Sequence, residues 1–597
     1  MLAFHDILWS LTNDELGFRL RLLERKPHSP KKADLIDAIK TCYSGSGLNA
    51  VWSSLNDLEQ KAVAEACYAP DFTHLETRFD AKYDSLPPFC TRPKDAPEYQ
   101  HTSWDSKRAT RLNLLLFFSP ATRSRVVPAD LAERLRQFVP KPPATAVPTL
   151  AEPKPEEGLC VRLTEHEALS EVLALLRLAE QGNLKVSAAT GMPSAAGCAK
   201  ILECLTGGDF FPPEVAYLPH KKSYEQEIGP IKPVGWARLL QAGKYVAADG
   251  AKSKLTPAGI KALSQAPHEI IRHLWTKWLD NSAFDEFNRI DVIKGQSSKG
   301  HMTAKPPRRS VICSALSDCP VNQWVDLAKF STFMLAEGFE FEVSNDLGKL
   351  YLCELRYGNF DYSGYGDWHI VQFRYLLCLL FEYAASLGLI DIAYVHPRCA
   401  LDDFRDQWGA DDLEWLSRYD GLRAFRITHL GAYCLGMTED FKPTQPISSL
   451  KLSVLPNLSI RILAGSSQAA ERFLLETWAE PVAAGIWRLE PVRGREAIER
   501  GQSVADLAAF LRQCDDQPLP ETVEGFFKTC ESDGRALQNR GEAQLFECRD
   551  AKTATAVYAQ KELLNQCFRI GETHLAVPTA HLAKFRKVVR SLGLGIV

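Results

Sequence analysis

The sequence predicts an α+β protein of several domains. A pattern of helix, short strand, polar tip and second strand ends twice in the same way, in residues 243–260 and 422–433, with a threonine followed three positions later by glycine. Threonine caps the next helix, and glycine lets the backbone turn tightly. Because 597 residues are too many for one hydrophobic core, several domains are expected. We predict a mainly helical N-terminal unit, two winged-helix units and a C-terminal α/β domain.

Composition indicates a globular protein, with 45% hydrophobic and 24% charged residues. The formal net charge of −4 means that any binding of nucleic acid must come from local basic clusters. None of the sixteen cysteines has Cys-x-x-Cys spacing, so we expect reduced thiols, no metal site and no cofactor. The N-terminus lacks the pattern of a signal peptide, and the apolar stretch 375–395 contains Glu382 and Asp391. That stretch predicts a buried helix leading into a strand, and we expect a cytoplasmic protein without a membrane span.

The N-terminal unit, residues 1–138, shows helical spacing of its apolar residues, with a helix cap at Thr12 or Asn13. Two helices around 16–23 and 31–39, joined by a proline-containing loop, resemble SAP-type DNA-binding modules. A two-helix hairpin with a solvated pair at Lys31 and Lys32 explains the same pattern equally well. Residues 139–158 hold six prolines and few large apolar residues, which predicts a semi-rigid linker and a domain boundary.

The remaining boundaries follow from changes of pattern along the chain. In the first winged-helix unit we expect the recognition helix at 195–205, where Lys200 is the only charge on a short exposed face. In the second unit the corresponding helix, Phe373–Phe381, is apolar all round and is expected to be buried. The predicted parts after the first linker are winged helix 159–266, helical and basic connector 267–308, winged helix 309–438, linker 439–449 and α/β domain 450–597.

Catalytic motifs are absent. A phosphate-binding loop needs Gly-Lys followed by Ser or Thr, and neither Gly243-Lys244 nor Gly348-Lys349 satisfies this. Asp285-Glu286 looks like the acidic box of a helicase but follows no such loop. A nuclease site built on Asp346, Glu354 and Arg356 remains an alternative, although its spacing is loose. We therefore expect a protein that is not an enzyme.

Basic clusters offer the better functional signal. Residues 294–309 contain six basic side chains, His301 among them, and no acid, which is typical of a flexible cationic loop that neutralises phosphates. A solvated linker is the competing explanation for residues 294–309. Lys252 and Lys254 on the first wing have a competing explanation as well, because any wing tip must be polar. The candidate DNA-binding residues are Lys31, Lys32, Lys200, Lys252, Lys254, Lys294, Lys299, Lys305, Arg308 and Arg309.

Several segments of the last domain carry a family resemblance. Residues 450–460 read Leu-Lys-Leu-Ser-Val-Leu-Pro-Asn-Leu-Ser-Ile, and 472–480, 487–489 and 497–503 continue the likeness. They resemble the helicase-associated domain at the N-terminus of XPB-family helicases, which also occurs in bacterial XPB-like helicase-associated proteins. Residues 1–70 are similar to the N-terminus of those bacterial proteins. Winged helices followed by such a domain also resemble the TFIIH subunit that binds XPB through a clutch-like domain.

The resemblance implies a partner and regulator of a DNA translocase, while every helicase motif is missing. It predicts a non-catalytic adaptor that binds DNA weakly and without sequence preference and docks an XPB-like or other superfamily-two translocase, in DNA repair or in defence against foreign DNA. The aromatic residues Phe473, Trp478 and Trp487 are candidate anchors for that partner, with burial in the domain's own core as the alternative. A stand-alone winged-helix transcription regulator and a metal-dependent nuclease are the competing functions.

Overall fold

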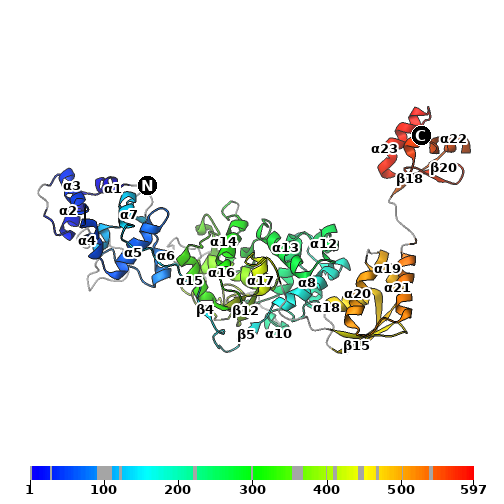
Figure 1. The fold of residues 1–597 in the computed structure, drawn as a ribbon, viewed down its shortest axis with the longest axis horizontal. Coiled ribbons are helices and arrows are strands. Elements are labelled where there is room, and N and C mark those ends of the chain that lie inside the picture. The colour runs from blue at the N-terminus through cyan, green and yellow to red at the C-terminus, as the bar shows by residue number, and fades with distance from the viewer. Residues whose placement is uncertain are drawn as a thin grey trace. The chain divides into compact units, whose positions relative to one another are not determined.

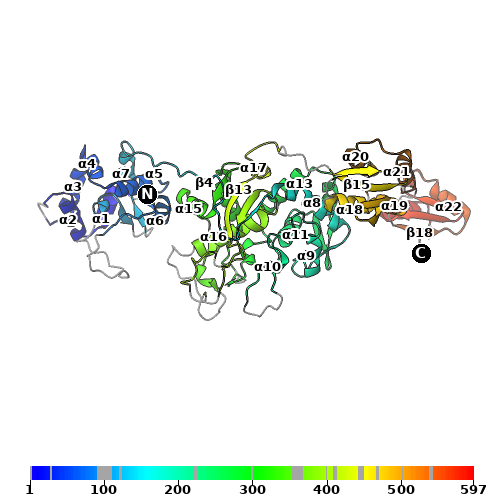
Figure 2. The ribbon, with the colours of Figure 1, turned by 90° about the horizontal axis from the view of Figure 1, so that it is seen from below.

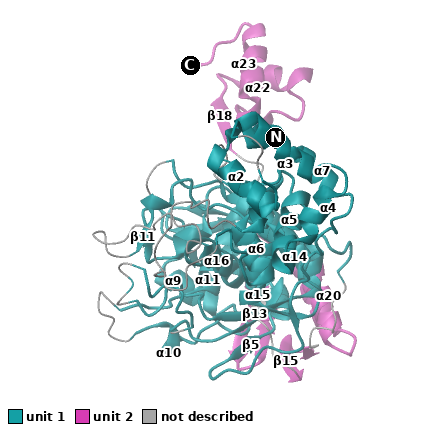
Figure 3. Ribbon diagram, turned by 90° about the vertical axis from the view of Figure 1, so that its left-hand side faces the viewer, with its two compact units in different colours: residues 1–447, 468–470 teal, residues 448–467, 471–597 magenta. Residues whose placement is uncertain are grey.

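The computed structural model divides the chain into two compact units. Residues 1–447 with 468–470 form unit 1, and residues 448–467 with 471–597 form unit 2 (Figure 3). Helices and small antiparallel sheets occur in both, which confirms the α+β class. The structure describes residues 3–26, 30–90, 110–119, 124–218, 225–296, 300–352, 368–398, 400–407, 410, 413–441, 450–464, 469–499, 502–534, 536 and 542–597.

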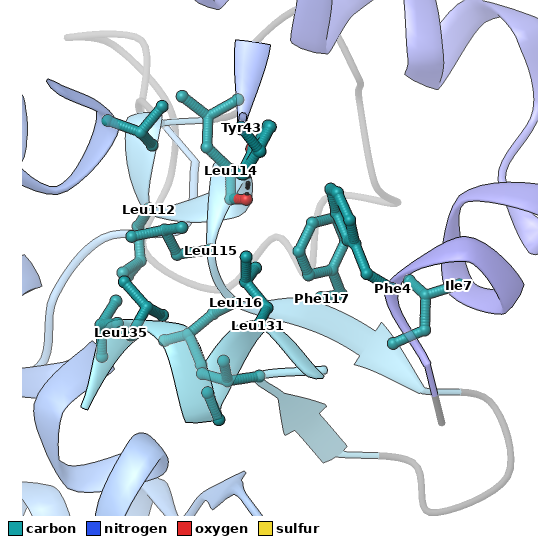
Figure 4. Close-up of a cluster of buried hydrophobic side chains, with 14 of the residues drawn as sticks. Phe4, Ile7, Tyr43, Leu112, Leu114, Leu115, Leu116, Phe117, Leu131 and Leu135 are labelled. Atoms are coloured by element: carbon teal, nitrogen blue, oxygen red, sulfur yellow. Dashed lines mark hydrogen bonds between the residues drawn. The ribbon is translucent and has the colours of Figure 1, made fainter. Parts of the chain in front are cut away.

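The N-terminal part of unit 1 is mainly helical, as predicted. Its hydrophobic cluster joins the first helix to the segment 112–117, and the Tyr43 hydroxyl donates to the Leu114 carbonyl at 2.6 Å (Figure 4). The Thr12 side chain caps the second helix in a capping box with Glu15, which confirms that cap. Its helices are α1 (Phe4–Ser10), α2 (Asn13–Leu22), α3 (Lys32–Cys42), α4 (Gly47–Ser53), α5 (Asp57–Tyr68), α6 (Glu76–Tyr83), η2 (Arg111–Leu114) and α7 (Ala129–Leu135), and its strands are β1 (Thr73–His74), β2 (Phe117–Ser119) and β3 (Ser124–Val126).

A three-stranded sheet carries the first predicted wing. The strands β7 (Val246–Asp249) and β8 (Lys252–Leu255) form a hairpin, and β6 (Leu184–Lys185) adds to β8. This hairpin is the one expected from the sequence. The helices around it are α8 (Glu165–Glu180), α9 (Ala195–Leu202), α10 (Pro213–Ala216), α11 (Lys232–Ala242), α12 (Pro257–Ala262) and α13 (Pro267–Leu279).

The second predicted wing lies in a five-stranded antiparallel sheet of order β4-β10-β13-β12-β5. Figure 1 labels its strands β4, β12 and β5. Its strands are β4 (Thr149–Leu150), β5 (Cys160–Arg162), β10 (Trp324–Asp326), β12 (Ile390–Tyr394) and β13 (Leu422–Ile427). Because β4 pairs with β10, the expected linker 139–158 is part of this sheet rather than a free spacer. Because β5 pairs with β12, the predicted units 159–266 and 309–438 share one sheet.

The segments between the two hairpins contain further short elements. They are η3 (Glu286–Arg289), β9 (Ile293–Lys294), α14 (Lys305–Ser317), α15 (Leu327–Glu337), η4 (Leu347–Lys349) and β11 (Tyr351–Leu352). One continuous helix then runs over residues 368–384, with π-helical turns in η5 (Trp368–Gln372) and η6 (Leu379–Ala384) on either side of α16 (Phe373–Cys378). After the second hairpin, unit 1 ends in α17 (His429–Cys434).

The two hairpins close with the same set of hydrogen bonds. Thr256 caps α12 by accepting from the Gly259 N–H, and its own hydroxyl donates to the carbonyls of Lys244 and Tyr245. Thr428 caps α17 by accepting from the Gly431 N–H, and its hydroxyl donates to the carbonyls of Gly388 and Leu389.

The glycines are required there, because a Cβ on Gly259 would lie 2.2 Å from the Tyr245 oxygen and one on Gly431 would lie 2.0 Å from the Leu389 oxygen. In unit 1 the strand order first-third-second occurs in β1-β3-β2, in β6-β8-β7 and, within the five-stranded sheet, in β10-β13-β12, and the same order recurs in unit 2. The repeat seen in the sequence is therefore structural, but this strand order is not specific to the two hairpins.

Unit 2 begins at residue 448, close to the start of the expected domain 450–597, and contains two hydrophobic clusters. One gathers residues of 450–530 and the other residues of 557–589. The stretch 450–463 is a hairpin that turns at Pro456-Asn457.

The first part of unit 2 has a sheet of order β14-β15-β17-β16 with helices α18 to α21 (Figure 2). Its elements are β14 (Lys451–Val454), β15 (Ser459–Ala464), α18 (Ala469–Trp478), β16 (Ala479–Ala483), β17 (Ile486–Leu489), α19 (Pro491–Glu499), α20 (Val504–Cys514) and α21 (Glu521–Gly534). The second part has β18 (Ala543–Glu547), α22 (Ala551–Tyr558), η7 (Lys561–Leu563), β19 (Phe568–Ile570), β20 (His574–Pro578), η8 (Thr579–His581) and α23 (Leu582–Ser591).

Candidate nucleic-acid interface

The first hairpin presents its two lysines to solvent, as expected for a wing. Lys252 and Lys254 are exposed on β8. The Lys254 ammonium lies 2.6 Å from the Asp249 carboxylate, and this hydrogen bond lowers the pKa of Asp249. In the described part of the chain Lys252 makes no ion pair, so it is the freer of the two cations for a phosphate.

The helix directly before the first hairpin is α11, so the expectation that 195–205 is the recognition helix is wrong. α9 lies earlier in the chain, and its Lys200 is held 2.9 Å from Glu203 one turn away. A proline-containing loop precedes α11, so the sequence pattern does not show that α11 is the helix that leads into the hairpin. In a winged helix, the element before the wing is the one that would enter a DNA groove.

α11 is buried over most of its length, including its first charged residue. The Lys232 ammonium lies 2.8 Å from both Glu167 and Glu171, and the Trp236 indole donates to Glu171 at 3.1 Å. Burial raises the pKa of Glu171, against the attraction of Lys232. Such a helix belongs to the core and offers nothing to a DNA groove.

The helix before the second hairpin, residues 368–384, is also buried, which confirms the expectation for Phe373–Phe381. It packs with its η6 end against α11, and the two backbones approach so closely that a Cβ on Gly235 would lie 2.5 Å from the Glu382 oxygen. We call α11 and the helix 368–384 the buried helix pair. α13 packs against α11 of this pair and also contacts α8 and α17 (Figure 2).

Acidic residues inside this core have cationic partners. Glu382 accepts two hydrogen bonds from Arg289, at 2.9 and 3.0 Å, and Asp391 accepts from Arg426 at 2.7 Å. Burial raises the pKa of Asp391, which Arg426 opposes. These contacts explain how a helix and strand that read as an apolar stretch tolerate two acids.

The predicted cationic loop 294–309 is wrong for three of its basic residues. Arg308 and Arg309 lie in α14, not in a loop, and both are buried. The buried His301 ring contacts the Ser344 hydroxyl at 2.8 Å and the Gly295 carbonyl at 3.0 Å. Lys294 is exposed on β9, Lys305 is half-buried at the start of α14, and Lys299 lies outside the described residues.

The two arginines pair with the acids that had suggested a helicase box. Arg308 contacts Asp285 at 3.0 Å, and Arg309 contacts Glu286 at 2.6 Å. The Arg309 guanidinium also donates to three backbone carbonyls, and the Tyr375 hydroxyl donates to Glu286 at 2.7 Å. Asp285-Glu286 and Arg308-Arg309 are therefore a double internal ion pair, and neither pair of residues is available to a phosphate.

The N-terminal lysines lie beside α3. Lys31 is exposed at the N-cap of α3, and the half-buried Lys32 ammonium lies 5.7 Å from the centroid of the Trp9 ring. α2 and α3 pack together as the expected helical hairpin. This geometry is compatible with either reading of the segment, as a DNA-binding module or as a hairpin with solvated lysines.

Two of the three expected partner anchors belong to the core of unit 2. Trp478 is 0% exposed and Trp487 is 4% exposed, and both lie in the hydrophobic cluster of residues 450–530. The expectation that these two tryptophans are exposed anchors is wrong, because the sheet β14-β15-β17-β16 and its helices cover them. Phe473 is in α18, but its side chain lies outside the described residues.

The nuclease alternative gains no support from the described side chains. Asp346 lies 3.3 Å from Lys349, while Glu354 and Arg356 lie outside the described residues. Among the residues that the structure covers, no three His, Cys, Asp or Glu side chains are grouped so that they could hold a metal ion. Within the same residues, no helix combines the length and the apolar character needed to cross a bilayer.

Comparison with known proteins gives no match, either to a protein-family model or to a curated sequence. The functional assignment therefore depends on the chain's own residues.

One basic element was missed by the reading of the sequence. From residue 573 to the C-terminus the chain contains no acid, and the amphipathic helix α23 carries four lysines and arginines there. The signal was present in the sequence, but the last helix was read only as part of a compact α/β domain.

Proposed function

We propose that this protein is a non-catalytic DNA-binding adaptor that docks and regulates a superfamily-two DNA translocase, XPB-like or related, in DNA repair or in defence against foreign DNA. The proposal takes the strands β6-β8-β7 and β10-β13-β12 as parts of the two winged-helix units and the region from residue 450 as the helicase-associated domain. It rests on the resemblance of residues 450–503 to that domain, together with the absence of a phosphate-binding loop.

The observation that carries the proposal is the buried helix pair. A winged-helix transcription regulator places the helix before its wing in the major groove. Here α11 and the helix 368–384 pack against each other through Gly235, so neither can enter a groove without unfolding the core. This packing favours a protein that binds partner proteins and the DNA backbone. It disfavours a stand-alone transcription regulator that reads a DNA groove.

The partner surface is assigned to exposed residues in place of the buried tryptophans. In the sheet β14-β15-β17-β16, β16 is an edge strand whose Val482 is 55% exposed. Leu463, which is 65% exposed, lies near the end of the interior strand β15 and adds exposed apolar surface to the same sheet. An edge strand has unpaired backbone groups to which a strand of another protein can add. We place the translocase contact at this edge.

The test begins with the tagged full-length chain purified from its native host. We expect a superfamily-two ATPase to co-purify, and we expect the reconstituted pair to hydrolyse ATP faster on DNA than the ATPase alone. The adaptor alone should show no turnover. Val482→Asp with Leu463→Asp should abolish the stimulation, whereas Lys528→Asp on the exposed face of α21 should leave it intact.

Two outcomes would overturn the proposal. One is ATP turnover by the adaptor alone that survives repurification. The other is an ATPase whose rate on DNA does not change when the adaptor is added.

A further inference from the structure

α23 is strongly divided into an apolar and a basic side. Phe585, Val588 and Val589 are 2%, 4% and 4% exposed and pack in the cluster of the C-terminal sheet. All the charged residues of the helix are exposed. We call these four residues the basic face; they are Lys584, Arg586, Lys587 and Arg590.

The helical repeat places these four residues on one side. At about 100° per residue, they span an arc of roughly 160°, and the three buried side chains fill the opposite side. From the first to the last, the cations extend along roughly 9 Å of the helix axis. This density of positive charge is greater than on the first hairpin, where Lys254 is already paired with Asp249.

No acid neutralises the basic face from nearby. The last acid in the sequence is Glu572, and in the described structure none of the four cations is in an ion pair. In the same part of unit 2, Arg549 lies 3.3 Å from Asp550, and Arg569 donates to the Gly571 and Glu572 carbonyls, whereas the exposed Lys552 and Lys561 make no ion pair among the described residues. The basic face is distinguished by carrying four such cations on one helix.

The exposed and buried sides of α23 distinguish among three kinds of partner: an anionic membrane surface, a protein and duplex DNA. A membrane-surface helix needs its apolar side for the acyl chains, and that side of α23 is buried in the protein. A protein interface needs apolar or aromatic anchors at its centre, and beside the cations the exposed side of α23 offers only Ala583 and Ser591. The phosphates of duplex DNA need cations alone, and a single helix fits the roughly 12 Å width of the major groove.

We propose that the basic face of α23 binds the phosphate backbone of duplex DNA without reading its sequence. This inference deepens the proposed function and rests on it, because it assigns the adaptor's principal DNA contact to unit 2. The exposed side of α23 has no amide or acidic side chain to recognise adenine or cytosine. Arg586 and Arg590 are of the type that recognises guanine, so equal binding of duplexes with different sequences is the result that assigns them to phosphates.

The test compares two variants of the full-length chain, each with four exposed cations removed. The first carries Lys584→Gln, Arg586→Gln, Lys587→Gln and Arg590→Gln. The matched control carries Lys252→Gln, Lys254→Gln, Lys261→Gln and Lys277→Gln around the first hairpin, where all four lysines are exposed. Fluorescence anisotropy with labelled duplexes of unrelated sequence, at several salt concentrations, measures the affinity and its salt dependence.

We expect the α23 variant to lose about 100-fold in affinity, and its slope of log affinity against log salt to fall by about 3 to 4. The hairpin variant also removes the candidate contacts Lys252 and Lys254 of the first wing, and it should lose less than about 10-fold, because Lys254 is already paired with Asp249. Both duplexes should bind equally, and vesicles of anionic lipid should not bind. Unchanged thermal unfolding of the variant shows that the exposed substitutions leave the fold intact.

Failure of this inference is distinguishable from failure of the proposed function. If the α23 variant binds DNA as tightly as the unchanged chain, or if only the hairpin control loses binding, the inference is overturned while the translocase contact stands. If the unchanged chain binds no DNA, both the inference and the DNA-binding part of the proposed function fail. The α23 variant should still co-purify with the translocase, because that contact is assigned to Val482 and Leu463.

Discussion

Arg309 is fully buried, and its charge is tolerated because Glu286 lies 2.6 Å away. A buried ion pair of this kind contributes little net stability compared with apolar residues, but loss of one partner leaves an uncompensated charge in the core. The hydrogen bonds from Trp278 and Tyr375 to Glu286 tie the same pair to two aromatic side chains. The pair therefore fixes how α14, α13 and the helix 368–384 meet.

We expect Arg309→Met to lower the free energy of unfolding of unit 1 by about 3 to 5 kcal/mol, because Glu286 would remain buried and charged. Urea unfolding followed by circular dichroism measures the change. The matched control is Arg423→Met, which removes a partly exposed ion pair with Glu156 and should cost less than about 1 kcal/mol. Equal losses in the two variants would contradict the assignment of Arg309 to the core.

His74 supplies a pH-dependent contribution to stability. It is 3% exposed, neither ring nitrogen has a hydrogen-bond partner among the described residues, and burial with the nearby Arg125 lowers its pKa to about 4. Folded His74 stays neutral between its ordinary pKa of about 6.5 and pH 4, while unfolded His74 takes up a proton. The stability contributed by His74 is thus complete above pH 6.5 and is lost as the pH falls to about 4.

We expect this loss to reach about 3 kcal/mol at pH 4. His74→Phe, which keeps the ring contacts with Phe79 and Phe89, should make the stability of the N-terminal part less dependent on pH over this range. Urea unfolding of both proteins from pH 7 to pH 4 measures the difference. Parallel pH profiles would show that His74 is protonated or solvated in the folded state.

At the scale of elements, the threonine–glycine closure of each hairpin is the feature that the sequence predicted best. Both threonine caps were implied by the residue types, because few other side chains cap a helix in this way. The role of the glycines was not, since the sequence suggested a tight turn, whereas each glycine is required by its close approach to a carbonyl oxygen. The burial of Phe373–Phe381 was predictable for a similar reason, since a helix that is apolar on every side is stable only when it is buried.

Other elements depend on contacts distant in the sequence. β4 is a strand because Trp324 and Val325 on β10 pair with it. Residues 149–150 alone carry no pattern that predicts this pairing. Arg308 and Arg309 read as loop cations because their partners, Asp285 and Glu286, precede them by 23 residues. The exposure of the lysines at the first hairpin was accordingly predictable, whereas the burial of His301, Arg308 and Arg309 was not.

We expect Gly431→Ala and Gly259→Ala each to cost about 2 kcal/mol or more, since the added Cβ would overlap a backbone oxygen that cannot move without breaking the hairpin. Gly17→Ala in the middle of α2 is the control, because nothing lies within 4 Å of its Cβ position. That change should stabilise the protein by about 0.5 to 1 kcal/mol. Thermal unfolding ranks the three variants, and a stabilising effect at Gly431 would contradict the close approach.

At the scale of the whole molecule, unit 2 draws its two hydrophobic clusters entirely from its own residues. We expect residues 450–597, expressed alone, to fold with the helix content seen in the full chain and to unfold cooperatively. Circular dichroism and a thermal melt provide the measurement. A fragment that stays unfolded, or that binds a dye for exposed apolar surface, would show that unit 2 needs the rest of the chain.

The packing of the buried helix pair also limits how this gene can evolve. A recombination break between residues 266 and 309 would separate α11 from the helix 368–384 and β5 from β12, and each product would inherit half of a core. Independent shuffling, duplication or loss of either hairpin unit is therefore selected against. Where descendants of this sequence have been rearranged, we expect the break points to fall outside 159–438, so that the two hairpin units are inherited as a single block.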